Sequence, residues 1–250
     1  MTRIHEQIDD PAFVARPVPN NHGGKGTASV SGLASGARGA ATRFELDTLA
    51  GSKNGYQVPS KFYPVAKRGL DLLVAPAAIL FTIPIVLVAL AASALSTRSW
   101  PLMAQTRIGQ YGRAFKIYKI RTMNPNVHLP PGSPHKLKDD PRVGRVGRFL
   151  RKNSIDELPQ FWNVLIGNMT LVGPRPELPE IVAHYAPWQH ERHVVPPGIT
   201  GWWQILWRSE KPLHHSTEDD IYYVKNRCLL LDLRILLRTP GVVFRGHGAY

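Results

Sequence analysis

The sequence predicts a mainly α-helical protein with one small β-hairpin, attached to a membrane by an apolar segment that proline interrupts. Three observations lead to this fold class. Residues 72–95 carry no charge, residues 101–123 read as two strands around a Gly-rich turn, and residues 155–166 repeat apolar side chains at helical spacing.

The chain has 250 residues and a net charge of +13. This length suits one or two domains, and the excess charge calls for an anionic partner: nucleic acid, an acidic membrane surface or a phosphorylated substrate. Residues 1–58 hold six Lys/Arg against five Asp/Glu, so the basic character belongs to the remainder. Cys228 is the only cysteine, which excludes an intrachain disulfide.

Composition divides the chain into three parts. Residues 1–58 are rich in Gly, Ser, Ala, Pro and Asn with little apolar periodicity, which predicts a flexible, disordered linker. Residues 59–100 contain the apolar run, and residues 101–250 form the folded domain that follows it.

As a straight helix, the apolar run would be about 36 Å long, against a bilayer core of about 30 Å. Lys67 and Arg68 precede it and Arg98 follows, and positive charge on both flanks fits poorly with a simple crossing. Pro84 divides the run into halves of about 16–18 Å. The residues leave two models open: a re-entrant hairpin that turns at Pro84, or a kinked helix that spans the bilayer once.

After this run, Leu102–Ile108 reads as one strand, 109–112 as the turn, and Phe115, Ile117 and Ile120 mark the second strand. Four basic side chains accompany the hairpin: Arg107, Lys116, Lys119 and Arg121. Such residues often only keep an edge strand soluble, but they could instead form a phosphate-binding wall.

Two adjacent carboxylates, Asp156 and Glu157, follow arginines spaced three apart. This arrangement suggests a site for phosphate and a divalent metal. The alternative is a capping box, in which Ser154 and Glu157 begin a helix that ends at Gly167. Pro159 weakens the capping model, because it would lack the N–H that its place in such a helix requires.

Three later segments each permit two interpretations. Arg175 lies between two prolines, and a stiff loop of this kind suits a bidentate grip on phosphate or a structural ion pair. Residues 202–208 contain three tryptophans and Arg208, and indoles favour either lipid headgroups or a core. Residues 228–244 could lie in the membrane plane as an amphipathic interfacial helix or pack internally.

The order of these motifs resembles the bacterial sugar transferases, the monotopic polyprenyl-phosphate phosphoglycosyl transferases, and is most like the ExoY-type exopolysaccharide initiators. The resemblance runs from about Pro64 to the C-terminus. It rests on the apolar run with its central proline and on six motifs: 67–71 (KRGLD), 115–123 (FKIYKIRTM), 154–164 (SIDELPQFWNV), 171–176 (LVGPRP), 197–202 (PGITGW) and 220–226 (DIYYVKN).

The resemblance implies a phosphoglycosyl transferase. A sugar 1-phosphate would move from a UDP-sugar, carrying galactose or glucose, to undecaprenyl phosphate, releasing UMP and initiating exopolysaccharide synthesis. It matches Asp156 to the nucleophile that forms a covalent aspartyl intermediate, and Glu157 to its partner. Both carboxylates would be ligands of Mg²⁺, a hard ion suited to carboxylate and phosphate oxygens.

The resemblance also implies where these parts lie. Arg175 matches a phosphate-gripping arginine, and we place Lys119, Arg121, Arg107 and Arg208 with it as substrate-binding residues. Residues Lys67, Arg68 and Asp71 match the start of a re-entrant membrane helix and Pro84 matches its bend, which favours the hairpin model. Residues 101–250 would form a catalytic domain at the cytoplasmic face of the bacterial inner membrane, in contact with its lipids.

Two other function classes compete with this interpretation. A membrane-tethered nucleic-acid-binding protein would account for the charge, but the arginines are interrupted by acids and glycines, and we expect no nucleic-acid partner. A non-catalytic scaffold for polysaccharide assembly would leave the carboxylate pair without a chemical role. The sequence predicts no particular oligomeric state.

Overall fold

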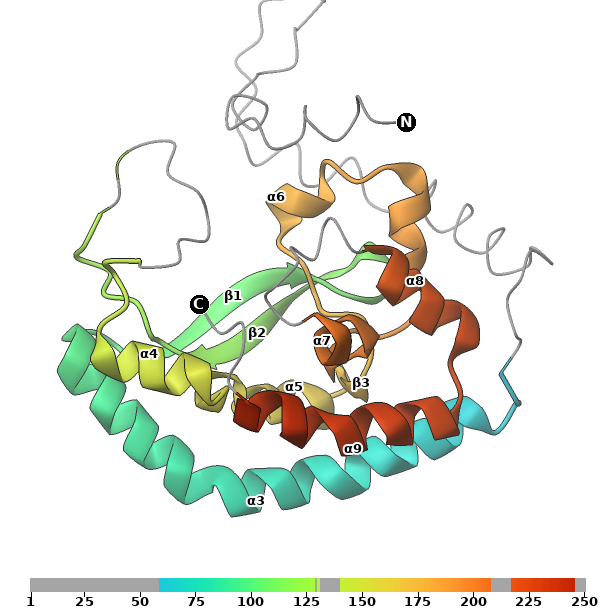
Figure 1. Cartoon of the computed structure of the whole chain (residues 1–250), viewed down its shortest axis with the longest axis horizontal. Helices are drawn as coiled ribbons and strands as arrows, with labels where there is room; N and C mark the ends of the chain where they lie inside the picture. The colour runs from blue at the N-terminus through green and yellow to red at the C-terminus, as the bar shows by residue number, and fades with distance from the viewer. Residues whose placement is uncertain (1–58, 129, 131–139, 208–216, 246–250) are drawn as a thin grey trace, which may run out of the picture.

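A computed structural model describes residues 59–128, 130, 140–207 and 217–245. This part is mainly helical with an antiparallel hairpin, as the sequence predicts, and it also has a second small sheet that the sequence did not predict (Figure 1). The expected linker over 1–58 and the substrate-binding candidate Arg208 lie outside the described residues.

The apolar run forms α3 (Tyr63–Thr97), which continues through both Pro76 and Pro84. Figure 1 shows that α3 is bent, so that its two ends rise toward the rest of the protein. Each proline lacks the N–H that a helix needs, and the Thr82 hydroxyl donates to the Ala78 carbonyl at 2.6 Å, two features that bend helices. The resemblance favours a hairpin that turns at Pro84, whereas the structure has a bent but unbroken helix.

Polar contacts tie the first half of α3 to the domain. Lys67 pairs with Asp232 at 2.9 Å. The Arg68 guanidinium donates to two carbonyls at the end of α5, those of Val164 and Leu165. Asp71 is buried, and its carboxylate accepts from Thr170 and from the backbone of residue 171. The three residues matched to the start of a membrane helix therefore hold that helix against the domain.

The second half of α3 is tied down as well, but the middle is not. Ser93 donates to the Arg121 carbonyl, and Ala89 is buried against Ile120 and Leu150. Between these anchors the helix exposes large apolar side chains, among them Leu80, Phe81, Ile83, Ile85, Leu87 and Val88. Among the described residues, α3 is the one helix whose length and composition would let it cross a membrane.

The predicted hairpin is confirmed. β1 (Leu102–Ile108) pairs antiparallel with β2 (Ala114–Ile120), and η1 (Gln110–Gly112) joins them. Helix α5 (Gln160–Leu165) packs against β2, and its buried Asn163 accepts from the Tyr118 N–H and donates to the Lys116 carbonyl. One side chain thus satisfies the outer edge of β2 and fixes the hairpin to the helix.

The segment around the acidic pair differs from the single helix that was predicted from Ser154 onward. Helix α4 (Arg145–Lys152) ends, Ser154 takes a left-handed conformation with φ 55°, and a short 3₁₀ turn, η2 (Ile155–Glu157), precedes α5. Ser154 makes no side-chain cap, so the capping-box model is wrong. Pro159, which cannot donate a helical hydrogen bond, stands at the N-cap of α5.

A two-stranded parallel sheet joins two of the sequence motifs, 171–176 and 197–202. β3 (Thr170–Val172) pairs with β4 (Gly198–Thr200), and α6 (Pro179–Val182) and η3 (Pro187–Val194) lie between them in the chain. A Cβ on Gly173 would meet the Pro196 carbonyl, and a Cβ on Gly198 would meet the backbone of Gly173. Glycine at both positions lets the backbones approach closely.

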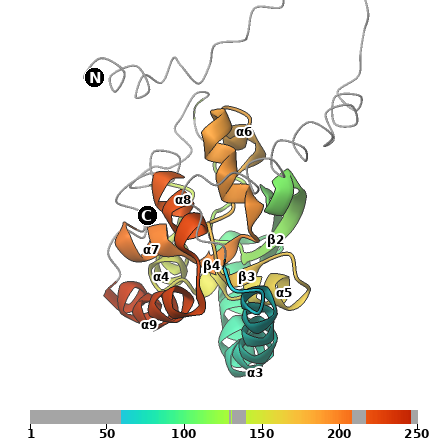
Figure 2. The same ribbon diagram turned by 90° about the vertical axis from the view of Figure 1, so that its right-hand side faces the viewer.

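The last helices are α7 (Trp202–Leu206), α8 (Thr217–Asn226) and α9 (Leu229–Arg245). Trp203 is buried, which places this indole in the core rather than at a surface. Helix α9 runs beside the first half of α3 (Figure 1 and Figure 2). It buries Leu231 and Ile235 but exposes Leu230, Leu233 and Leu237, so one face packs internally and the other is available to a partner.

Candidate active site

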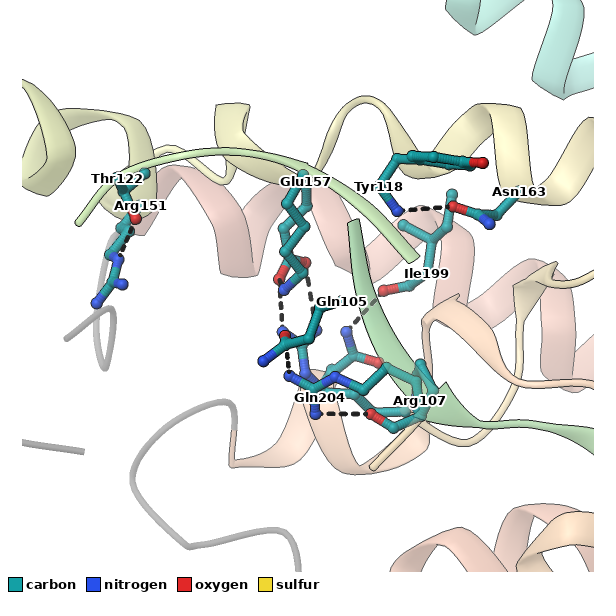
Figure 3. Close-up of polar contacts among 12 residues, drawn as sticks. Gln105, Arg107, Tyr118, Thr122, Arg151, Glu157, Asn163, Ile199 and Gln204 are labelled. Carbon is teal, nitrogen blue, oxygen red and sulfur yellow. Dashed lines mark hydrogen bonds and ion pairs between the residues drawn. The ribbon is translucent and has the colours of Figure 1, made fainter. Parts of the chain in front are cut away.

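The acidic pair lies in η2, between α4 and α5, and faces β2. The Glu157 carboxylate reaches two cations from different elements. Its Oε1 accepts from Lys119 Nζ of β2 at 2.9 Å and from Arg175 Nη2 at 2.5 Å, and its Oε2 accepts from Arg175 Nη1 at 3.2 Å (Figure 3). The structure therefore brings together three of the predicted site residues: Glu157, Lys119 and Arg175.

The two cations control the ionisation of Glu157. Burial on its own would raise the pKa of this carboxyl, but Arg175 and then Lys119 outweigh burial and hold the pKa well below its usual range. The same pairing raises the pKa of Arg175. Glu157 is thus ionised throughout the physiological range and is held in one orientation by a bidentate arginine.

Asp156 has a different environment, although it is adjacent in sequence. Its side chain is buried at 9% exposure, and in the described part of the chain no group hydrogen-bonds its carboxylate. Burial, reinforced by the neighbouring negative charge of Glu157, raises the pKa of Asp156 to about 6. At pH 7 it is an ionised carboxylate that is more basic than usual and has unengaged lone pairs.

Arg175 is positioned by residues that the sequence analysis did not identify. Arg192 Nη2 donates to the Arg175 carbonyl at 2.5 Å, and the same guanidinium pairs with Asp220 at 2.5 Å and donates to the Tyr185 hydroxyl at 2.8 Å. Arg192 and Asp220 are each 1% exposed at the side chain. Asp220 belongs to a motif that carried the family resemblance, which was the one available signal.

Arg107, another predicted site residue, lies close enough to the acidic pair for the charge of Glu157 to act on its guanidinium. Its guanidinium donates to the Pro176 carbonyl at 3.3 Å and to Gln105 Oε1 at 2.9 Å, while its buried Nε has no partner among the described residues (Figure 3). Burial lowers the pKa of Arg107, and the nearby charge of Arg175 adds to this. The side chain remains a cation close to the other two.

A small cavity of about 10 Å³ connects these cations. Three of the predicted substrate-binding residues line it, together with two apolar side chains and one amide: Arg107, Lys119, Arg175, Ile117, Pro176 and Gln160. The Gln160 side chain was not singled out from the sequence because it is neutral. It is 1% exposed, and its Nε2 has no partner in the described part of the chain.

Arg121 is the predicted substrate-binding residue that the structure places elsewhere. Its Nε donates to the Trp100 carbonyl at 2.8 Å, at the end of α3, and it does not line the cavity. In its place, Arg151 of α4 contributes charge near Asp156, with its Nε donating to Thr122 Oγ1 at 2.8 Å (Figure 3). Burial lowers the pKa of Arg151, and the charge of Asp156 offsets part of this effect.

The two carboxylates fit Mg²⁺ only as part of a shared site. The Asp156 oxygens accept no hydrogen bond from the described residues, and Glu157 Oε2 accepts one hydrogen bond where Oε1 accepts two. The described residues contain no group of three or more His, Cys, Asp or Glu side chains that could hold a metal. This donor set suits an ion that takes one or two carboxylates and completes its coordination with substrate phosphates and water, as Mg²⁺ usually does.

Known proteins of one family are similar to the chain over most of its length. A family model described as bacterial sugar transferase matches residues 62–246. The UDP-N-acetylgalactosamine-undecaprenyl-phosphate N-acetylgalactosaminephosphotransferase of Aeromonas hydrophila is 38% identical over 213 residues, covering 83% of this chain and 50% of that protein. The UDP-glucose:undecaprenyl-phosphate glucose-1-phosphate transferase of Escherichia coli is 37% identical over 195 residues, covering 74% and 41%.

A shorter relative is similar over most of its own length. The exopolysaccharide production protein ExoY of Sinorhizobium fredii is 34% identical over 200 residues, which cover 74% of this chain and 88% of that protein. In contrast, the chain spans about half the length of several curated relatives that it matches.

Proposed function

The chain belongs to the bacterial sugar transferase family, and from this premise we propose that it is a phosphoglycosyl transferase whose nucleophile is Asp156. It transfers a sugar 1-phosphate from a UDP-sugar to undecaprenyl phosphate and so initiates exopolysaccharide synthesis. The observation that carries this proposal is the contrast within the acidic pair: Glu157 is held by two cations, whereas the more basic Asp156 is unengaged.

The reaction proceeds in two displacements at one phosphorus. An Asp156 carboxylate oxygen attacks the sugar-bearing phosphorus of the UDP-sugar, a P–O bond forms, and the P–O bond to the bridging oxygen breaks. The electron pair leaves with UMP, and a sugar-phosphoryl group remains on Asp156 as an acyl phosphate. An oxygen of undecaprenyl phosphate then attacks the same phosphorus, which restores the Asp156 carboxylate.

The cations stabilise the negative charge that the carboxylate and the two phosphorylated substrates bring together. Both substrates are anionic, so a carboxylate nucleophile needs positive charge around the phosphoryl group. Lys119, Arg175 and Arg107 provide it, and Arg175 presents a planar fork that suits phosphate as well as carboxylate. Glu157 orients Lys119 and Arg175 toward the reacting group.

Asp156 and Glu157 would hold Mg²⁺ together with the phosphate oxygens of the donor. When bound, the ion neutralises phosphate charge and stabilises the leaving oxygen.

The lipid substrate calls for a membrane location, and α3 supports one. Its exposed apolar middle lies between two anchored ends, and Lys67, Arg68 and Arg98 lie at those ends. A helix with both ends bound to one domain suits re-entry through a single leaflet, at the cytoplasmic face of the inner membrane, where the cationic flanks stay. The exposed leucines of α9 would then rest among the lipids beside it.

The first experiment measures nucleotide release. Purified protein in detergent receives Mg²⁺, undecaprenyl phosphate and in turn UDP-galactose, UDP-glucose and UDP-N-acetylgalactosamine. Release of UMP with one of these sugars supports the proposal and identifies the donor. Release of UDP would mean a glycosyl transfer without phosphorus, and folded protein that releases no nucleotide would favour the scaffold alternative.

A further inference from the structure

Gln160 lies beside the site, and its buried polar side chain has no role in the mechanism above. It is 1% exposed, and its amide Nε2 has no hydrogen-bond partner among the described residues. Leaving a buried N–H without a partner is costly for folding. A donor kept in this condition beside a reaction centre calls for a ligand that accepts its hydrogen bond.

The surroundings of this amide specify the ligand. The cavity that Gln160 lines is about 10 Å³, about one water-sized sphere, so it admits a single oxygen rather than a whole phosphate. Its other polar walls are the cations Arg107, Lys119 and Arg175, and Arg107 Nε is a second buried N–H without a described partner. No acid is among its lining residues, so the cavity suits one anionic oxygen.

The cations that line the cavity indicate which oxygen it would hold. Lys119 and Arg175 line the cavity, and the charges of both also act on the Asp156 carboxylate. The cavity and the nucleophile therefore share two cations. A nucleophile meets its phosphorus at about 3–3.5 Å, so a non-bridging oxygen of that phosphoryl group would lie within reach of the same cations and of the cavity between them.

We propose that the cavity lined by Gln160, Arg107, Lys119 and Arg175 is an oxyanion pocket, in which Gln160 Nε2 donates to one non-bridging oxygen of the phosphoryl group that Asp156 attacks. This inference rests on the proposed function and adds a neutral substrate-binding residue to it. The pocket stabilises the transition state more than the bound substrate, because the phosphoryl oxygen accepts stronger hydrogen bonds as the transition state forms. The phosphoryl group stays in the site after UMP leaves, so Gln160 acts in both displacements.

The test uses Gln160→Met, which keeps the shape of the side chain and removes the amide. UMP release is followed in a single turnover without acceptor. The protein that now carries the sugar-phosphoryl group is then mixed with undecaprenyl phosphate. We expect each step to slow by about 10²–10³-fold, the usual effect of removing one oxyanion-hole donor. We expect the melting temperature to stay the same or rise, because a buried donor without a partner has been removed.

Gln110→Met is the matched control, since Gln110 lies in the hairpin turn and its amide donates to the Val194 carbonyl at 3.1 Å. It should leave both rates within about twofold of the starting protein. Gln160→Glu provides a second variant of nearly equal size. Its carboxylate would compete with the phosphoryl oxygen for the three cations, and we expect a loss of rate at least as large as that of Gln160→Met.

The outcomes separate this inference from the function on which it rests. Unchanged rates in Gln160→Met, or a fall in melting temperature with unchanged rates, would mean that the cavity holds a structural water, and the inference would fail alone. If the unaltered protein releases no UMP with any sugar, the proposed function fails and the inference fails with it. A slowed first step with an unchanged second step would also overturn the assignment, because it would place Gln160 on the departing UMP.

Discussion

Two ion-pair clusters meet at Arg175 and differ in how completely their charges are matched. On one side, Arg192 and Asp220 are both 1% exposed, and Arg192 also binds Tyr185 and the Arg175 carbonyl. On the other side, the Arg175 guanidinium, Lys119 and Glu157 are between 14% and 29% exposed at the side chain. Asp156 lies beside this second cluster without a described hydrogen bond.

This difference indicates a structural role for the Arg192 cluster and a chemical role for the Glu157 cluster. The Arg192 cluster is almost fully buried and its two charges are paired with each other, although Asp220 Oδ1 has no partner among the described residues, and it fixes the backbone from which Arg175 projects. The Glu157 cluster keeps an unengaged carboxylate and an unpaired amide next to its cations, which is costly for folding but useful to an anionic substrate. Changes in the second cluster should therefore affect turnover more than stability, and changes in the first should do the reverse.

Asp156→Asn should have the largest effect on turnover. The amide keeps the shape but cannot form an acyl phosphate, so UMP release should fall by at least about 10⁴-fold. The fold should become more stable at pH 8, because a carboxyl whose folded pKa is raised stabilises the protein below that pKa and loses this contribution as pH rises through it. Turnover and thermal melting are measured together, with the exposed Glu180→Gln as control. Substantial UMP release by Asp156→Asn would contradict the chemical role of Asp156 and of the cluster beside it.

Arg175→Lys tests the shared member of both clusters. Lysine keeps the charge but loses the fork that binds both oxygens of Glu157, so we expect turnover to fall by about 10²-fold with little change in melting. Arg142→Lys is the matched control, because Arg142 also forks onto a carboxylate, that of Asp140. Equal effects of the two substitutions on turnover would remove the special role of Arg175.

The pH profile sharpens the contrast between the two carboxylates. Asp156 must be ionised to attack, and its pKa is raised to about 6 in the absence of metal. Because bound Mg²⁺ favours the ionised carboxylate, the rate of UMP release should fall with decreasing pH through an apparent pKa at or below 6. Glu157 stays ionised over this range because its pKa is held low. A single-turnover profile from pH 4 to 8 should give one ionisation at or below 6, and a flat profile would count against Asp156 as the nucleophile.

Asp220→Asn should have the smallest effect on turnover and a large effect on stability. It leaves the buried Arg192 without its counter-charge, which typically costs about 3–5 kcal/mol. The protein that remains folded should release UMP within about tenfold of the normal rate. Urea unfolding and turnover on the same sample provide the measurement, and a large loss of turnover without a loss of stability would reverse the proposed division.

Local patterns in the sequence predicted the elements that local physics determines. The hairpin strands followed from periodicity and are found. The uncharged run of 72–95 lies within one helix, but that helix begins earlier, at Tyr63, and continues through Pro84. The start of α5 was wrong because a left-handed Ser154 and Pro159 divide a stretch whose apolar spacing looks continuous.

The site residues that depend on distant contacts were harder to predict. Glu157 and Arg175 are 18 residues apart, and Arg192 and Asp220 are 28 apart, so their pairing follows from the fold and not from spacing. Lys119 and Arg121 are two residues apart and would share a face if β2 continued, but β2 ends at Ile120 and Arg121 turns to the end of α3. The neutral Gln160 gave no charge signal at all.

The central claim, that Asp156 carries the transferred group, is tested most directly by mass spectrometry. The protein is incubated with Mg²⁺ and its UDP-sugar without acceptor, treated with hydroxylamine to convert an acyl phosphate to a stable hydroxamate, and digested. We expect the hydroxamate on Asp156, at up to one per chain and in proportion to the UMP released. Release of UMP with the modification on another residue, or with no modified residue, would contradict it.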